Sequence, residues 1–167
     1  MNRFLVIVAL ATVLCGDLLA QAPAQDMSVD DLVKALTPQR TTTRTRSLRN
    51  LIVEPAKVDL VINFDFDSAR IQNSSKPQLE RLATAMKFEQ LQNIRFQVEG
   101  HTDGKGDVRY NQVLSEKRAQ AVASFLSQNG ISPGRLLSVG KGFSELLNKD
   151  DPNSPKNRRV RITTIDQ

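Results

Sequence analysis

Residues 100–122 decide the fold of this chain, and they read GHTDGKGDVRYNQVLSEKRAQAV. A polar loop comes first, in which Gly104 and Gly106 let the backbone turn tightly and approach a ligand closely. A helix follows, and Asp107 stands where its side chain can cap the first turn. A tight polar loop that leads into a helix is typical of a ligand-binding site rather than of a catalytic one.

One cation lies on the apolar face of this predicted helix. Leu114, Arg118 and Val122 are four residues apart, so they share one face. A guanidinium at the border of a core is costly unless an anion meets it, and Asp103 is a nearby partner. Two interpretations stay open from these residues: the pair binds a ligand, or it forms a structural salt bridge that closes the turn.

The stretch resembles the OmpA-like (OmpA/MotB C-terminal, Pal-type) peptidoglycan-binding domain, whose signature joins a GHTD loop to N-x-x-L-S-x-x-R-A-x-x-V. The resemblance covers about residues 57 to 165 and favours the ligand-binding interpretation. The fixed positions of the signature are present as Gly100, His101, Thr102, Asp103, Asn111, Leu114, Ser115, Arg118, Ala119 and Val122. Two flanking motifs of the family also match, as Phe64-Asp-Phe66-Asp67-Ser-Ala and Asn157-Arg158-Arg159-Val160.

This resemblance implies a ligand and a set of site residues. In the family, the positions that match Asp103 and Arg118 hold the free end of diaminopimelate in the peptidoglycan stem peptide, which carries an ammonium and a carboxylate on one carbon. The pair suits that zwitterion, because Arg118 can bind a carboxylate through two parallel hydrogen bonds while Asp103 accepts from the ammonium. The other residues expected to line the groove are Thr102, Phe66, Asp67, Asn111 and Leu114.

The expected function is therefore noncatalytic binding of peptidoglycan in the periplasm, which ties an envelope component to the cell wall. The alternative is a protein-interaction module that docks in an envelope complex through a helix near the N-terminus. An enzyme is not expected, because His101 is the only histidine and no nucleophile with its base is visible. A single histidine also supplies too few ligands for a typical metal cluster. We therefore expect no cofactor and a structural role for His101.

Residues 1–20 predict export. A short positive region at Met1-Asn-Arg3 precedes an apolar run from Phe4 to Leu14, as in a secretory signal peptide. We expect cleavage after Ala20, with Ala24 as the second choice. The mature protein would then be periplasmic. We leave open whether it associates there with the outer membrane.

The single cysteine, Cys15, leaves a lipoprotein interpretation open. A lipid on Cys15 would tether the domain to a membrane, but Leu14 stands where the processing signal expects a small residue. A third interpretation keeps residues 4–20 as an uncleaved anchor, although that run is short and Asp17 interrupts it. We favour the signal peptide, which leaves the mature chain without cysteine.

Residues 21–56 are expected to form a short helix and a basic flexible linker. The helix runs to Leu36 with Ser28 as its cap. Residues 37–49 are polar and lack apolar periodicity, which favours a linker.

The net charge of +5 comes from this leader, because residues 32–53 hold five basic side chains and no acid. A solvated linker is the simpler interpretation of this charge. The sharper one is attraction to anionic envelope surfaces, such as lipid head groups or wall polymers. Nucleic acid is not expected as a partner, since no aromatic side chains interleave the arginines. The arginines concerned are Arg40, Arg44, Arg46 and Arg49.

Residues 57–167 form the predicted domain, with the order β-α-β-α-β-β. This α+β pattern suits a sheet with helices on one face, the OmpA-like sandwich that the resemblance implies. The site residues would then come from strand ends and the loops after them. A helix is expected to begin near Ser75 with a capping box and Pro77 in its first turn. The predicted strands are Lys57–Phe64, Ile94–His101, Leu136–Val139 and Val160–Ile165.

The basic motif at the last strand has two expected roles. Alternation along the strand turns Arg159 and Arg161 outward as surface charge. We also leave open that Arg158 or Arg159 packs back toward the loop that holds Asp103.

Overall fold

The computed structural model describes residues 27–44 and 49–165. The expected signal peptide, its cleavage sites and Cys15 therefore lie outside the described residues. Within the described ranges, no helix combines the length and the apolar character that crossing a bilayer requires.

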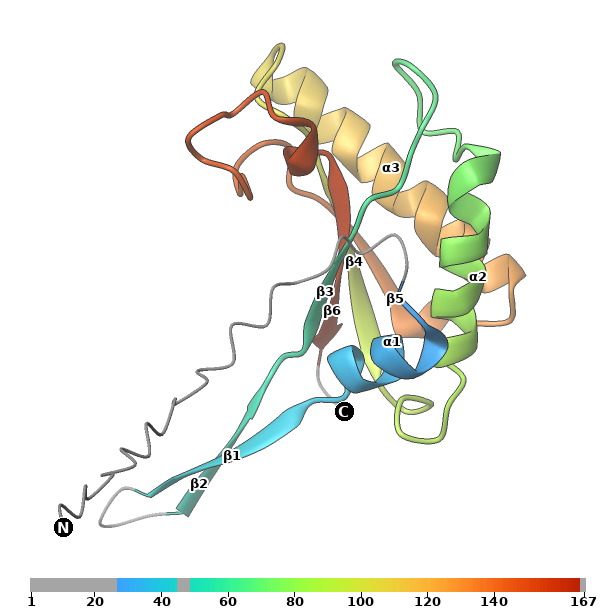
Figure 1. The fold of residues 1–167 in the computed structure, drawn as a ribbon, viewed down its shortest axis with the longest axis vertical. Helices are drawn as coiled ribbons and strands as arrows, with labels where there is room; N and C mark the ends of the chain where they lie inside the picture. Colours follow the sequence, from blue (N-terminus) through green and yellow to red (C-terminus); the bar gives the residue numbers. More distant parts are fainter. Residues whose placement is uncertain (1–26, 45–48, 166–167) are drawn as a thin grey trace, which may run out of the picture.

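A four-stranded sheet in the order β3-β6-β4-β5 forms the centre of the structure. Strand β6 runs antiparallel to both β3 and β4, whereas β4 and β5 are parallel. A parallel pair needs a crossover connection, and helix α3 supplies it. The strands are β3 (Lys57–Leu60), β4 (Arg95–His101), β5 (Leu136–Gly140) and β6 (Arg159–Ile165), and the two longer helices are α2 (Lys76–Ala85) and α3 (Val108–Gln128). Figure 1 shows α2 and α3 on the same side of the sheet, which confirms the predicted α+β class.

The core fills the space between this sheet and the two helices. Alternating residues of the strands point into it as the sequence predicts, and α2 contributes its predicted apolar stripe. Burying each large apolar side chain contributes roughly 1.5–3 kcal/mol. The buried residues include Val58, Leu60, Ile62, Ile94, Phe96, Val98, Val160 and Ile162 from the strand regions and Leu79, Leu82, Ala83 and Met86 from the α2 region.

The connection between β3 and α2 differs from the sequence prediction in two ways. The first strand ends at Leu60, and farther along only an isolated bridge joins Phe64 to Ile71. The capping box predicted at Ser75 is wrong, because this hydroxyl makes no cap bond to the helix. It accepts a hydrogen bond from the backbone N–H of Asn63 at 2.8 Å instead. Ser75 thus holds the end of the first strand segment against the start of α2.

Helix α1 (Val29–Leu36) lies where the sequence predicts it and belongs to the folded body. Ser28 and Asp31 form a complete capping box. Leu32 and Leu36 are fully buried in the core, and the helix packs against α2 and β3. The N–H at Nε of Arg81 also donates to the carbonyl of Met27 at 3.1 Å.

The segment expected as a flexible linker contains regular structure. Strands β1 (Gln39–Arg44) and β2 (Arg49–Glu54) pair antiparallel, with Arg44 opposite Arg49. Figure 1 shows this hairpin projecting away from the four-stranded sheet. Runs of Thr and of Leu-Ile-Val favour extended backbone even where the hydrophobic pattern is weak, which accounts for the difference.

Candidate functional site

A groove of about 750 Å³ opens at the rim of the sheet where β3 and β4 end. Its walls come from the loop after the first strand, the loop after β4 and the first half of α3. The structure brings all the predicted site residues to this groove: Asp103, Arg118, Asn111, Leu114, Thr102, Phe66 and Asp67.

The end of β4 lies pressed against α3 because Gly100 has no side chain. A Cβ atom there would stand 2.1 Å from the carbonyl oxygen of Ser115. The Ser115 hydroxyl accepts from the N–H of Gly142 at 2.9 Å, and the N–H of Thr102 donates to the carbonyl of Gly142 at 2.8 Å. These contacts join strand, helix and the turn after β5 into one rigid support for the loop that follows.

The loop between β4 and α3 is held at both ends. The N–H of Gly104 donates to the carbonyl of Pro152 at 2.8 Å. Asp107 caps α3 as predicted, accepting from two N–H groups of the first turn. Gly106 has a φ of 90°, which glycine adopts without strain, and Asn111 donates from Nδ2 to the carbonyl of Lys105 at 2.7 Å.

Asp103 is 8% exposed and forms a salt bridge with Arg158. The distance from Nη1 of Arg158 to Oδ2 of Asp103 is 2.8 Å, so the expectation that Arg158 packs toward the loop is confirmed. Within the described ranges, the salt bridges do not join Asp103 to Arg118. The sequence interpretation in which these two residues close the turn as a structural salt bridge is therefore not what the structure shows.

Arg118 is a partly buried cation held by neutral groups. Its Nε donates to the carbonyl of Ser68 at 3.1 Å, and its guanidinium carbon lies 4.9 Å from the centre of the Phe64 ring. Burial lowers the pKa of Arg118, and the charge of Arg158 lowers it further, although Asp103 and Asp67 act in the opposite direction. An anionic ligand would compensate this cation.

Other side chains complete the groove. Phe66 is 99% exposed at its edge. Asp67 has a φ of 49°, rare for a residue other than glycine, and the hydroxyl of Tyr110 donates to its carboxylate. Sequence reasoning missed Tyr110, although it lies directly before Asn111 in the first turn of α3. The remaining lining residues that it did not name as site residues are Phe64, Asp65, Gln72, Lys105 and Arg158.

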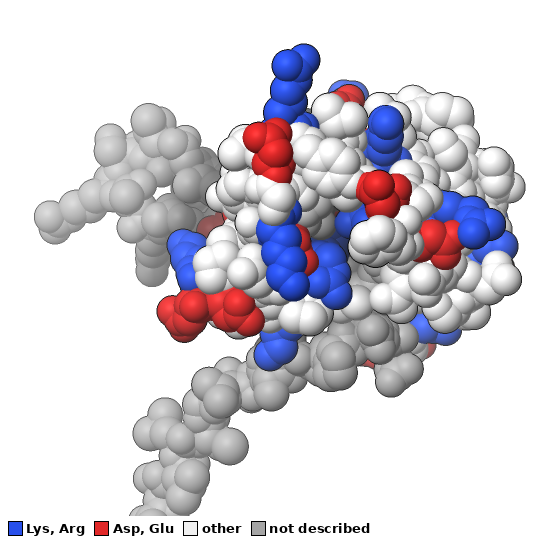
Figure 2. Space-filling view, turned by 90° about the horizontal axis from the view of Figure 1, so that it is seen from above, with Lys and Arg blue, Asp and Glu red and all other residues white. Residues whose placement is uncertain are grey.

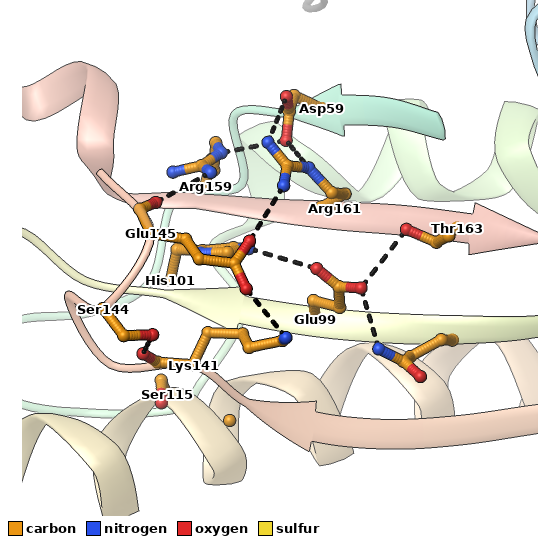
Figure 3. A network of polar contacts seen from close by, with 12 residues as sticks. Asp59, Glu99, His101, Ser115, Lys141, Ser144, Glu145, Arg159, Arg161 and Thr163 are labelled. Atoms are coloured by element: carbon orange, nitrogen blue, oxygen red, sulfur yellow. Dashed lines mark hydrogen bonds and ion pairs between the residues drawn. The ribbon is translucent and has the colours of Figure 1, made fainter. Parts of the chain in front are cut away.

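The sheet face away from α3 carries a network of charged groups (Figure 3). Arg159 lies on the predicted face, away from the core, but its expected role as exposed surface charge is wrong, since it is 3% exposed and donates from Nε to Asp59 at 2.9 Å. Arg161 donates to the same carboxylate. The difference arises because β6 is an inner strand, and the segment after β5 adds the carbonyl of Glu145 as a further acceptor for Arg159.

Potential ligand atoms of Glu99, His101 and Glu145 lie within 4.8 Å of one another in this network. Cations already neutralise the acids: Lys141 lies 2.8 Å from Glu145, and Arg161 3.3 Å. Burial alone would raise the pKa of Glu99, but the nearby His101 ring, the hydrogen bond from Gln97 and the charge of Lys141 hold it below its usual value. The arrangement is that of an ion-pair network rather than of a metal centre.

Charges of both signs alternate at the rim of the molecule. Figure 2, which looks down on the molecule from above, shows basic and acidic side chains interspersed on that face. No large field of a single sign covers the described part of that face, so the charge at the groove is that of individual side chains such as Arg118.

Known proteins are similar to this chain in sequence and in fold. Outer membrane porin F of Pseudomonas aeruginosa is 38% identical over 112 residues, which are 65% of this chain and 31% of the porin. The peptidoglycan-associated lipoprotein of the same species is 34% identical over 101 residues, which are 59% of this chain and 58% of the lipoprotein. This chain thus matches less than two thirds of the length of either relative.

A solved structure, the cell wall anchor of the T6SS from Pseudomonas aeruginosa, superposes with a TM-score of 0.59 at 26% identity, covering 83% of this chain and 94% of that one. These similar proteins belong to the cell envelope by their names, in agreement with the expected location. The model of the OmpA family matches residues 63–161. Because this match covers more than half of the sequence, the chain belongs to the OmpA family.

Proposed function

We propose that this protein binds peptidoglycan without catalysing a reaction, and thereby anchors an envelope component to the cell wall in the periplasm. The ligand is the free ammonium–carboxylate end of diaminopimelate in the stem peptide. The observation that carries the proposal is the groove itself, in which Arg118 is compensated by no salt bridge from the described residues and lies in the same cavity as Asp103.

The contacts of the two residues suggest how the zwitterion is held. Nε of Arg118 already donates to Ser68, so its two terminal nitrogens offer the remaining N–H groups to a carboxylate. The ligand ammonium would replace Arg158 as the partner of Asp103, which keeps this carboxylate paired in both states. A ligand that lacks the carboxylate would leave Arg118 without an anion, and one that lacks the ammonium would leave Asp103 with Arg158 and make no ion pair with this carboxylate.

Sedimentation of the purified protein with cell-wall sacculi tests this proposal. Asp103→Ala and Arg118→Ala should each stay in solution while the wild type sediments. Arg118→Lys should bind more weakly than the wild type, because an ammonium cannot form the two parallel bonds. Arg95→Ala and Asp150→Ala are matched controls, since both residues are exposed and lie outside the groove.

Circular dichroism separates binding from folding in this experiment. If Asp103→Ala and Arg118→Ala are folded and do not sediment, the proposed clamp is supported. If both variants sediment like the controls, the ligand is held elsewhere and the proposal is wrong. A muropeptide-cleaving activity that stays with the purified protein would contradict the noncatalytic assignment.

We also propose that the basic segment before the four-stranded sheet attracts anionic envelope surfaces through Arg40, Arg44, Arg46 and Arg49, of which Arg46 lies outside the described residues. The composition of this segment supports it, because residues 32–53 hold five basic side chains and no acid. Binding to vesicles with anionic lipids should fall as salt is raised and disappear when the four arginines are replaced by glutamine. Equal binding by this variant would contradict the proposal.

The structure does not favour the alternative of docking through the N-terminal helix. The apolar side chains Leu32 and Leu36 that such a contact would use are fully buried in the protein's own core. Peptidoglycan binding through the groove is therefore the better supported function.

A further inference from the structure

A second, smaller cavity of about 210 Å³ lies beside the groove. It is bounded by the segment after β3, the end of β4 and the segment that leads into β6. Arg118 and Arg158 line both cavities, so the two spaces meet at these guanidinium groups. The smaller cavity has room for a few water molecules or one small ion.

The polar lining of this cavity carries positive charge and amides. Arg118, Arg158 and Arg159 reach it together with His101, and no carboxylate from the described residues lines it. Asn63 and Gln72 add amide groups. Arg159 is engaged by Asp59 and by backbone carbonyls, whereas the hydrogen bond of Arg118 uses Nε alone. Four N–H groups of Arg118 are thus available to the two cavities, because a guanidinium carries about five.

His101 gives an independent sign that this cavity takes a ligand. The residue is 2% exposed, and neither ring nitrogen has a hydrogen-bond partner among the described groups. Nε2 lies 3.5 Å from Glu99, which is longer than a normal hydrogen bond. A buried polar atom without a partner destabilises the folded protein, so a group held in the cavity that bonds to the ring would relieve this cost.

We propose that this cavity is an anion-binding subsite, which takes one small oxyanion, a carboxylate or a phosphate, between the guanidinium groups of Arg118 and Arg158 and the protonated ring of His101. Where the anion is a second carboxylate of the wall peptide, the subsite rests on the proposed function. Where it is a free ion, the subsite is independent of the groove ligand.

Binding of the anion is coupled to uptake of a proton by His101. In the ligand-free protein, burial and the charges of Arg159 and Arg161 lower the pKa of His101, against the effect of Glu99. An anion in the cavity favours the imidazolium and raises this pKa. The charged groups around the ring are Glu99 on its own strand, Arg159 and Arg161 on β6, Lys141 and Glu145 after β5, and Arg118 and Arg158 at the cavity.

Nuclear magnetic resonance of the full chain tests the subsite directly, because the sequence contains a single histidine and its ring signals need no assignment. Inorganic phosphate is titrated against sodium chloride of equal ionic strength. We expect a saturable shift of the His101 ring nitrogens with phosphate alone, and a raised pKa of the ring in the phosphate-bound protein.

Two variants separate the subsite from the groove. Asn63→Asp places a carboxylate in the smaller cavity, and Asn63 does not line the groove; we expect phosphate binding at least about tenfold weaker, since a like charge opposes the anion. Asp103→Ala removes a groove residue that does not line the smaller cavity, and it should keep the phosphate response whether or not the protein still sediments with sacculi.

The source of the anion is distinguished by adding a muropeptide that contains diaminopimelate to the phosphate-saturated protein. Displacement of phosphate assigns the subsite to a second carboxylate of the wall peptide, and simultaneous binding assigns it to a free oxyanion. The proposal is overturned if phosphate leaves the His101 signals unchanged, if chloride shifts them equally, or if Asn63→Asp responds like the wild type.

Discussion

His101 and Asp103 stand two residues apart at the end of β4, and their surroundings give them different roles. His101 lies in the polar network between β4 and β6, whereas Asp103 lies at the groove, where Arg158 is its partner. Arg118 completes the contrast, since a backbone carbonyl and an aromatic ring position it, and we propose that its terminal nitrogens bind the ligand carboxylate.

The buried imidazole makes stability depend on pH. The folded-state pKa of His101 lies below its usual value, so on acidification the unfolded chain takes up a proton first, from about pH 6.5. Above that pH the neutral His101 ring makes its full contribution to the free energy of unfolding, and this contribution is lost as the pH falls toward the folded-state pKa of the ring. For the wild type, the urea concentration at the unfolding midpoint should therefore decrease as the pH is lowered from about 7.5 to about 5.

His101→Gln should remove most of this decline, because the ring that resists protonation is absent. Since the sequence has one histidine, the comparison isolates this group. If the unfolding midpoints of both proteins decreased in parallel, the pH dependence could not be assigned to His101.

Close packing at Gly100 predicts a large effect of a single methyl group. Gly100→Ala forces a Cβ atom against the Ser115 carbonyl and should cost about 3 kcal/mol or more, at the upper end of the usual cost of overpacking. Gly134→Ala is the matched control, because the nearest atom to its Cβ would be 3.9 Å away. Urea unfolding of both variants measures the difference, and similar values would refute the packing argument.

At the scale of elements, helix α1 is short but contributes to the core from its buried side. Leu32→Ala should destabilise the protein by roughly 2–5 kcal/mol, because the side chain is fully buried. Ser28→Ala removes the capping hydrogen bond and should cost about 1 kcal/mol. Lys34→Ala, at an exposed position of the same helix, serves as the control in urea unfolding. A loss for Leu32→Ala no larger than that of the control would show that α1 does not stabilise the domain.

The order of elements was predictable because apolar periodicity and capping residues are local signals. Helix α1 and the cap at Asp107 are examples. The motif in residues 100–122 and the flanking motif at Phe64–Ala69 also predicted seven of the side chains that line the groove, although Tyr110 was missed. The role of Ser75 was not predictable from its neighbours, because its hydroxyl serves a backbone group of another segment. The predicted exposure of Arg159 was wrong for a related reason. Alternation assigns a residue to one face of a strand, but burial of that face depends on which strand lies beside it.

At the scale of the whole molecule, the core of the described residues includes helix α1 and is not confined to the sheet and the two longer helices. A chain that starts at Met27 should keep the circular dichroism spectrum and the sacculus binding of the longer protein. A chain that starts at Pro38 lacks α1, uncovers apolar surface on α2 and β3, and should unfold at lower urea concentration. Equal stability of the two chains would mean that α1 is dispensable.

The position of β6 sets the order of events during folding. This strand comes last among the described elements, yet it pairs with both β3 and β4 in the interior of the sheet. Until residues 159–165 have been synthesised, β3 and β4 lack the strand that lies between them. Their apolar side chains therefore cannot pack into a complete core. Such distant pairings slow folding. A chain that leaves the ribosome or a translocation channel from its N-terminus therefore has an incomplete sheet until β6 emerges, and during that time it is exposed to aggregation and to chaperones.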